Sequence, residues 1–259
     1  EIAVAAFLVF ALSRMTYTDV FQQGYGRRLV SDHELRLGLL IVTVVPALLF
    51  LRHWIGAAEV GEEAALGLAL RALWGAVFMV MSFLTTTGFV SAEWEAAQGW
   101  SGLGTPGTLL VGLAVLGGGV GTTAGGVKLL RVWALYTHSE REVEKLIYPS
   151  SVGGAGQAAR RLRREGAEVA WIFFMLYALS IAIVSSAYAL AGLDFETSMV
   201  LTVAALSTTG PLTQVGAEAP ILMSALGELA KGITMAAMIV GRLETLALIA
   251  LLNPQFWRN

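Results

Sequence analysis

The sequence predicts an all-α integral membrane protein in which one structural unit occurs twice. Three observations support this prediction. Of the 259 residues, 56% are hydrophobic and only 14% are charged, whereas about a quarter are charged in a soluble domain. Two Thr-Thr-Gly tracts each follow a short apolar stretch of helix length. Between these tracts, a longer apolar stretch is interrupted by a run of glycines.

Residues 1–34 are interpreted as the end of a transmembrane helix followed by a cytoplasmic linker. Ile2–Leu12 is apolar but shorter than the roughly 20 residues that cross a bilayer. The chain has no initiator Met, so we expect this helix to begin further upstream. A polar segment, Arg14–Glu34, follows. At its end, Ser31 and Glu34 have the spacing of a capping box, which predicts the start of the next helix.

Residues 35–136 are predicted to form the first helix–pore helix–helix unit. Leu35–Leu51 is apolar enough to span, and Pro46 within it predicts a kink. Ala72–Leu84 is apolar for only about a dozen residues, the length of a helix that enters a membrane without crossing it. It ends at the first tract, Thr85-Thr86-Thr87-Gly88.

The third stretch of this unit, Thr108–Tyr136, is long enough to span but cannot be one regular helix. Six of ten consecutive residues at its centre are glycine, namely Gly117, Gly118, Gly119, Gly121, Gly125 and Gly126. Each costs about 1 kcal/mol relative to Ala in a helix. Helix packing through small residues, the alternative explanation, spaces glycines every fourth position. We therefore predict a broken inner helix, with Thr122 and Thr123 able to offer hydroxyls to a pore.

Residues 137–168 are predicted to form a cytoplasmic linker, and residues 169–259 to repeat the plan of the first unit. The elements of this second unit are a span at Val169–Ala191, a short helix at Thr197–Leu206, the tract Ser207-Thr208-Thr209-Gly210 and a span at Ile221–Leu252. Gly88 and Gly210 are 122 positions apart, which sets the offset of the repeat. Internal repeats of this kind organise many membrane folds.

Both tracts are candidates for an ion-selectivity filter. Irregular backbone at membrane depth must be buried in protein or line water, and its carbonyls can replace the hydration shell of a cation. Gly supplies the positive φ that aims successive carbonyls in one direction. A simple turn between helices is the alternative for one tract, but two tracts after two short helices favour a filter. The candidate residues are Thr85, Thr86, Thr87, Gly88, Ser207, Thr208, Thr209 and Gly210.

The distribution of charge predicts the orientation in the membrane. Cations gather on one side, at Arg27, Arg28 and the eight Lys and Arg residues from Lys128 to Arg164. Acidic residues gather on the other side, at Glu59, Glu62, Glu63, Glu93, Glu95, Asp194 and Glu196. By the positive-inside rule the basic side is cytoplasmic. Both tracts then face outward beneath an acidic mouth that would concentrate cations.

Arg242 lies within an apolar run, where a charge is costly unless it is paired. We hypothesise that it bonds carbonyls of the glycine run or of a tract, and adds a positive barrier to the conduit. An Arg that extends to the membrane interface is the alternative. Glu244, two positions later, faces elsewhere on the helix. The chain has no Cys and three scattered His. Since no metal-ligand or nucleophile–base spacing appears, we expect no enzymatic chemistry and no cofactor.

Four motifs together resemble the C-terminal half of a Trk/Ktr/HKT-type potassium transporter, closest to the bacterial TrkH branch. They are Thr85–Phe89, Gly117–Lys128, Met238–Glu244 and Asn253–Arg258. The resemblance implies four helix–pore–helix repeats around one pore, in which this chain supplies the third and fourth. It also implies that the glycine run gates the pore from below, and our own hypothesis adds Arg242 to this gate. K+ would be held at Thr86, Thr87, Gly88, Thr208, Thr209 and Gly210.

The predicted function is therefore potassium uptake across the inner cell membrane by a multi-pass protein. The resemblance implies a homodimer and a cytosolic nucleotide-binding regulatory subunit, with the lipid bilayer as environment and no nucleic acid. Only two of four filter tracts are present, so further N-terminal repeats or a second copy must complete the pore. Two alternatives stay open. One is a non-conducting structural or regulatory half-subunit. The other is a membrane-embedded enzyme, although the predicted spans contain almost no His, Asp or Glu.

Overall fold

The computed structural model describes residues 1–12, 32–60, 66–103, 105–120, 122–148 and 157–243. Within these ranges the chain forms helices and connecting segments without a strand. Three of the described helices are long and apolar enough to cross a membrane, with apolar windows at His33–Arg52, Gly67–Leu84 and Gly166–Leu190. The prediction of an all-α fold with several membrane-length helices is thus confirmed for this part of the chain.

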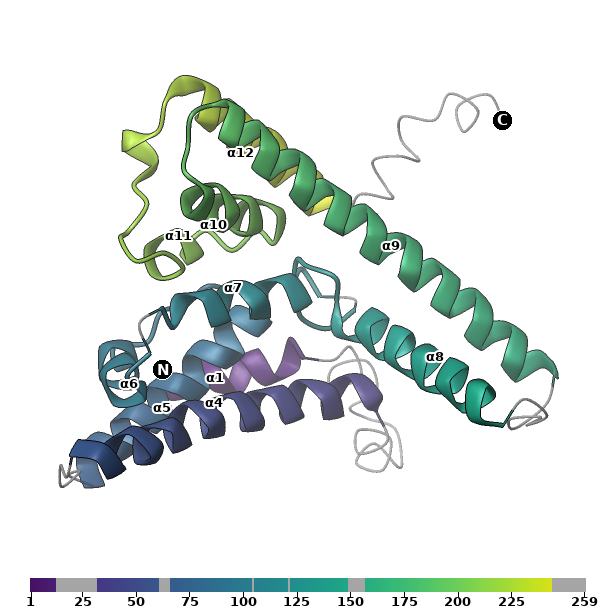
Figure 1. Ribbon diagram of the computed structural model, residues 1–259, viewed down its shortest axis with the longest axis horizontal. Coiled ribbons are helices and arrows are strands. Elements are labelled where there is room, and N and C mark those ends of the chain that lie inside the picture. Colours follow the sequence, from purple (N-terminus) through teal and green to yellow (C-terminus); the bar gives the residue numbers. More distant parts are fainter. Residues whose placement is uncertain (13–31, 61–65, 104, 121, 149–156, 244–259) are drawn as a thin grey trace.

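The helices form two groups that follow each other along the chain (Figure 1). The first group comprises α1 (Ile2–Phe10), α4 (His33–Val60), α5 (Leu66–Leu84), α6 (Trp94–Ser101), α7 (Gly107–Leu116) and α8 (Leu129–Ile147). The second comprises α9 (Gln157–Leu190), α10 (Phe195–Leu206), α11 (Leu212–Val215), the 3-10 turn η1 (Met223–Ala225) and α12 (Glu228–Leu243). Helices α8 and α9 pack side by side, and α10 and α11 both pack against α7, so the two groups are in contact.

Helices α5 and α10 are the most enclosed elements of their groups. Met79, Val80 and Phe83 of α5 are fully buried, and they belong to one apolar cluster with Leu110 of α7 and Val203 of α10. Because lipid is as apolar as these side chains, close packing rather than exclusion from water holds such a cluster together. The C-terminal ends of α5 and α10, where the two tracts begin, therefore lie inside the protein.

The structure differs from the sequence prediction at the start of several helices. Helix α5 is 19 residues long and begins at Leu66, not at Ala72. Its first turns contain good helix formers, and Arg71 forms a two-pronged ion pair with Glu93 at 2.7 and 2.9 Å. A charged side chain therefore does not mark the helix boundary there. Helix α12 begins at Glu228 rather than Ile221. Helix α10 begins close to its predicted start, with the Asp194 carboxylate accepting the Thr197 N–H at 3.0 Å.

The glycine run separates α7 from α8. Helix α7 ends at Leu116 and α8 begins at Leu129. We call the segment between them, residues 117–128, the glycine loop. At its two ends the chain returns close to itself, because the Val127 and Lys128 N–H groups donate to the carbonyls of Val115 and Leu116 at 2.9 and 2.8 Å. The loop is thus closed at its base by the end of α7.

Candidate functional site

The two Thr-Thr-Gly tracts begin with the same hydrogen-bonded turn. The second residue after each helix has a positive φ, Thr86 at 54° and Thr208 at 57°. The main-chain hydrogen bonds of the two turns correspond at the 122-residue offset. The N–H groups of Thr86 and Thr208 donate to the carbonyls of Phe83 and Ala205, both at 3.2 Å. The N–H groups of Thr87 and Thr209 donate to the carbonyls of Ser82 and Ala204, at 3.0 and 2.9 Å. This pair of bonds is a Schellman motif, which satisfies the last carbonyls of a helix. The repeat that is visible in the sequence is therefore also a repeat of backbone geometry.

Thr at the positive-φ position of this motif is unusual. The position is commonly Gly, and a β-branched residue with positive φ is a genuine outlier. Such backbone strain costs on the order of 1–3 kcal/mol and gathers at functional sites. Neighbouring hydroxyls tie the turns down, since Thr85 Oγ1 donates to the Met81 carbonyl at 2.9 Å and Ser207 Oγ to the Val203 carbonyl at 2.6 Å.

The two tracts lie directly against each other. Thr209 Oγ1 donates to the main-chain carbonyl of Thr86 at 3.4 Å, across 123 positions of sequence. A Cβ built on Gly88 would lie 2.9 Å from Pro211 Cδ. Thr87 and Gly210 are exposed, whereas Thr86 and Thr209 are buried. The candidate residues of both tracts thus form one continuous structure with a buried and an open side.

The tracts diverge at their glycines. Gly88 has a φ of +77°, as expected for a residue that redirects the chain. Gly210 does not have a positive φ, because the chain there turns directly into α11 with Pro211 at its start. The expectation that Gly provides the positive φ in both tracts is therefore wrong for Gly210. In the second tract this conformation falls on Thr208 alone.

The glycine loop packs against both tracts. The Gly125 N–H donates to Thr86 Oγ1 at 2.9 Å. A Cβ on Gly125 would lie 2.2 Å from the Ser207 carbonyl oxygen, and one on Gly118 would lie 3.3 Å from Thr85 Cα. These positions need Gly because backbone meets backbone. Two residues predicted to gate, Gly118 and Gly125, are therefore in contact with residues predicted to form the filter.

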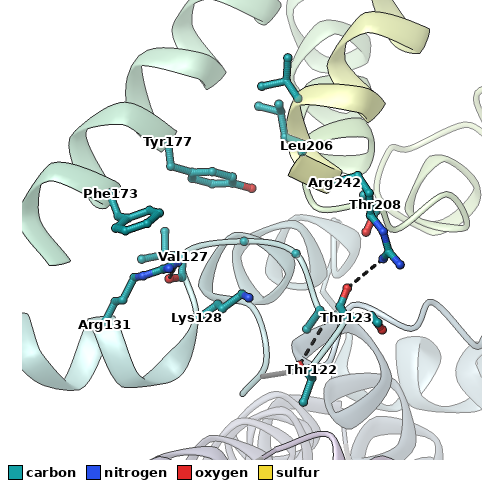
Figure 2. A pocket seen from close by; sticks show the side chains of 15 residues that line it. Thr122, Thr123, Val127, Lys128, Arg131, Phe173, Tyr177, Leu206, Thr208 and Arg242 are labelled. Atoms are coloured by element: carbon teal, nitrogen blue, oxygen red, sulfur yellow. Dashed lines mark hydrogen bonds between the residues drawn. The ribbon is translucent and has the colours of Figure 1, made fainter. Parts of the chain in front are cut away.

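Two charged side chains hold the glycine loop from opposite sides. Arg242 of α12 donates from Nη1 to the Thr123 carbonyl at 3.3 Å, a contact drawn as a dashed line in Figure 2. Glu34, in the first turn of α4, is 2% exposed, and its Oε1 accepts the N–H of Val120. The loop is thus attached through main-chain groups to α12 on one side and to α4 on the other.

Sequence reasoning did not find the role of Glu34. The predicted capping box used Ser31, which lies outside the described residues, and Glu34. In the structure Asp32 is the residue whose side chain accepts the Glu34 N–H, at 3.1 Å. The Glu34 side chain instead points to the glycine loop, 86 positions away. A carboxylate at the start of an apolar helix is the only signal in the sequence, and it also fits a capping residue.

A cavity of about 150 Å3 lies among the glycine loop, α9 and α12 (Figure 2). Thr208 and Arg242 line it, so it lies beside the second tract. Lys128 at the end of the loop and Tyr177 of α9 also line it, and Figure 2 shows both side chains directed into the space.

Comparison with known proteins identifies the family. A family model described as TrkH, cation transport protein, matches residues 7–257. The Trk system potassium uptake protein TrkH of Salmonella typhimurium is 34% identical over 191 residues, which are 74% of this chain and 38% of that protein. The Trk system potassium uptake protein TrkG of Escherichia coli is 28% identical over 234 residues, 89% of this chain and 44% of that protein. This chain belongs to the TrkH family of cation transport proteins.

Solved structures agree on the fold. The crystal structure of the potassium transporter TrkH from Vibrio parahaemolyticus superposes with a TM-score of 0.79 at 24% sequence identity, over 99% of this chain and 52% of that one. The chain therefore spans about half of that TrkH structure and less than half of the curated relatives. The resemblance noted from the four motifs is confirmed, as is the expectation that the chain is not an enzyme, because the family consists of cation transporters.

The membrane character of the chain follows from the same findings. TrkH family membership and several apolar helices of membrane length make it a multi-pass membrane protein. Among the predicted site residues, Gly121 lies outside the described residues, as do Glu244 and the motif Asn253–Arg258. The other predicted filter and gate residues lie together around the C-terminal ends of α5, α7, α10 and α12.

Proposed function

We propose that this chain forms part of a pathway for K+ across the membrane, lined by main-chain oxygens of the two tracts. The observation that carries the proposal is the contact between Thr209 and Thr86, which joins two turns of the same geometry. Each turn follows a helix C-terminus, whose partial negative charge favours a cation. Matched relatives are named potassium uptake proteins, so K+ is the proposed ion.

The proposed ion sites lie along the two tracts, with Thr87 and Gly210 at their open side. They comprise Thr86, Thr87, Gly88, Thr208, Thr209 and Gly210, with Thr85 and Ser207 supporting the turns through their hydroxyls. Carbonyl oxygens can take the place of water around K+ when they are held at the right separation. The strained Thr86 and Thr208 conformations and their hydrogen bonds would maintain that separation without any enzymatic step or resident cofactor.

The glycine loop is the proposed gate. Its described residues Gly117–Gly119, Thr122, Thr123, Gly125 and Gly126 lie between α7 and α8, directly against the tracts. Opening would require the loop to leave Thr86, Glu34 and Arg242, each of which bonds to it. A segment with two alternative arrangements switches between them when a few of its contacts are replaced by others. Arg242 would also place a positive charge next to the pathway when the loop is closed.

A pore of this kind is surrounded by four filter tracts, and this chain supplies only two of them. We therefore propose that further repeats or a second copy complete the pore, with residues 35–136 and 169–259 acting as its third and fourth units and residues 137–168 as a cytoplasmic linker. The homodimer, the cytosolic nucleotide-binding regulatory subunit and the inner-membrane location remain part of this proposal. The non-conducting half-subunit stays as the alternative.

Rubidium flux tests the proposal. The protein, expressed at full length and reconstituted in liposomes, is expected to take up 86Rb+ faster than empty liposomes, and excess K+ should compete with this uptake. Uptake equal to that of empty liposomes, with the protein folded and with partner repeats supplied by co-expression, would instead support the non-conducting alternative.

A further inference from the structure

The chain that follows the first tract is held at three consecutive residues. We call residues 89–93 the post-tract segment. Its first two residues, Phe89 and Val90, are exposed, whereas Ser91 is only 4% exposed. The Ser91 N–H donates to Met79 Sδ of α5 at 3.3 Å. The segment therefore returns to the side of α5 after two exposed residues.

The Glu1 carboxylate, at the start of α1, binds this segment. Its Oε1 accepts the Ala92 N–H at 2.8 Å and the Ser91 hydroxyl at 3.0 Å. The same hydroxyl accepts the Glu93 N–H at 3.1 Å. Glu1 Oε2 accepts the Nε1–H of Trp74 in α5 at 2.7 Å. Because hydrogen bonds to a charged acceptor are roughly twice as strong as neutral ones, one carboxylate firmly joins α1, α5 and the post-tract segment.

Glu93 is held by α5 itself. Arg71 donates to both of its carboxylate oxygens, at 2.7 and 2.9 Å. The Arg71 side chain is 68% exposed, and an exposed ion pair contributes little unless its geometry is bidentate or it belongs to a network, and this pair meets both conditions. A Cβ built on Gly75 would lie 2.5 Å from the Glu93 carbonyl oxygen, so the main chain of the segment also lies directly on α5. We call Glu1, Arg71 and Glu93 the clamp.

The clamp and the Schellman turn hold the first tract from both ends. The turn fixes the chain as far as Thr87, and the contacts of Ser91, Ala92 and Glu93 fix it afterwards. Only residues 88–90 lie between, and three residues span at most about 11 Å. Because few backbone dihedral angles remain free, the direction of the Gly88 carbonyl depends on where the clamp places the post-tract segment.

The second tract continues in a different way. Pro211 starts α11 directly after Gly210, and the Thr213 N–H donates to the Gly210 carbonyl at 3.1 Å. The corresponding carbonyl is thus held by a local turn of helix. The first tract has no helix at this point, so side chains from α1 and α5 take over the task.

We propose that the clamp positions the first tract for ion selection. The proposal rests on the proposed K+ pathway, because it treats the Gly88 carbonyl as an ion ligand. Selection between K+ and Na+ depends on the separation and number of such carbonyls. Loosening the post-tract segment should therefore change the preference between the two ions and not only the rate of uptake. Glu1, Arg71 and Glu93 are positioning residues, since they act through the main chain and need not touch the ion.

Hydrogen exchange of the full-length protein in nanodiscs tests the clamp without any ion gradient. Glu1→Ala removes the acceptor of the Ala92 N–H, so this amide should exchange about tenfold faster. Glu1→Gln keeps a carbonyl oxygen and should accelerate the exchange less. Glu228→Ala is the control, because this exposed carboxylate pairs with Lys231 on α12 at 3.0 Å, and it should leave Ala92 unchanged.

Competition between ions tests the consequence for selectivity. In liposomes, Glu1→Ala should lower the ratio of Rb+ to Na+ uptake about three- to tenfold. Arg71→Gln should lower it by up to about fivefold, because its ion pair is exposed. The charge swap Arg71→Glu with Glu93→Arg should recover most of the ratio. A role in stability alone would lower Tm and leave the ratio of the folded protein unchanged, and Lys231→Gln should leave it unchanged as well.

The two measurements separate the possible failures. Unchanged exchange of Ala92 in Glu1→Ala would overturn the clamp. Faster exchange with an unchanged Rb+ to Na+ ratio would overturn its role in ion selection, and so would an equal loss of the ratio in Lys231→Gln. If the wild-type protein took up no Rb+, the proposed function would fail and the role in selection with it, while the exchange rates would still decide whether the clamp exists.

Discussion

Removing the Glu34 carboxylate is expected to release the glycine loop. In the structure this buried side chain accepts the N–H of Val120 at the centre of the loop. A hydrogen bond to a charged group contributes about 1.5–3 kcal/mol, and a neutral bond about 0.5–1.5 kcal/mol. Glu34→Gln keeps an acceptor, so we expect a loss of about 1 kcal/mol. Glu34→Ala leaves the Val120 N–H buried without a partner, and we expect a loss of about 2–3 kcal/mol.

These losses translate into a shift of the proposed gate. At about 1.4 kcal/mol for each factor of ten, Glu34→Gln should raise the ratio of open to closed loops about fivefold, and Glu34→Ala by about 30-fold or more. The assay is 86Rb+ uptake in liposomes, combined with hydrogen exchange of the loop amides. Glu140→Gln, on an exposed part of α8, is the matched control and should change neither.

The order of the variants is the critical result. We expect both the uptake rate and the loop exchange rate to rise from wild type to Glu34→Gln to Glu34→Ala. Equal loop exchange in all three proteins would refute the idea that Glu34 anchors the loop. Faster exchange with unchanged uptake would keep the anchor but refute the loop as a gate.

Three further substitutions follow from the geometry of the site. Gly125→Ala places a Cβ 2.2 Å from a carbonyl oxygen of the second tract, so it should displace the glycine loop and disrupt regulated 86Rb+ flux. Gly112→Ala in α7 is the control and should be tolerated, because a Cβ there has no neighbouring atom within 4 Å. Gly88→Ala combines positive φ with a 2.9 Å approach to Pro211, a strain of about 1–2 kcal/mol, and should reduce Rb+ over Na+ selectivity by roughly 5- to 30-fold. Gly210→Ala should do less; equal effects would contradict the asymmetry of the tracts. Tyr188→Phe breaks the 2.7 Å bond to Thr234 between α9 and α12 and should cost about 1 kcal/mol of stability in denaturant unfolding without altering ion selectivity.

Local sequence signals predicted most of the helices and the interruption between α7 and α8. Apolar runs locate α4, α9 and α10, and the density of glycine locates the loop after Leu116. These predictions succeed because hydrophobicity and backbone preference act within a few residues. The predictions fail at helix boundaries such as Leu66. The helix there includes Arg71, because the Arg71 side chain forms an ion pair with Glu93 on the segment that follows the helix.

Contacts across the chain explain what the sequence could not predict. Glu34 and Val120 are 86 positions apart, and no local pattern links a helix start to a distant loop. The sequence shows that Pro211 follows only the second glycine, but it does not show that Gly210 thereby loses the positive φ that Gly88 keeps. Tyr177 sits in an ordinary apolar helix, and only the packing of α9 against the loop shows that its hydroxyl lacks a partner.

Crystals soaked with Tl+, a heavy-atom substitute for K+, give the most direct measurement of the central claim. We predict anomalous density on the open side of the two tracts, within coordinating distance of main-chain oxygens of residues 86–88 and 208–210, and its loss when K+ is added in excess. Density bound elsewhere with none at the tracts, in a structure where Thr86 and Thr209 still touch, would contradict the account.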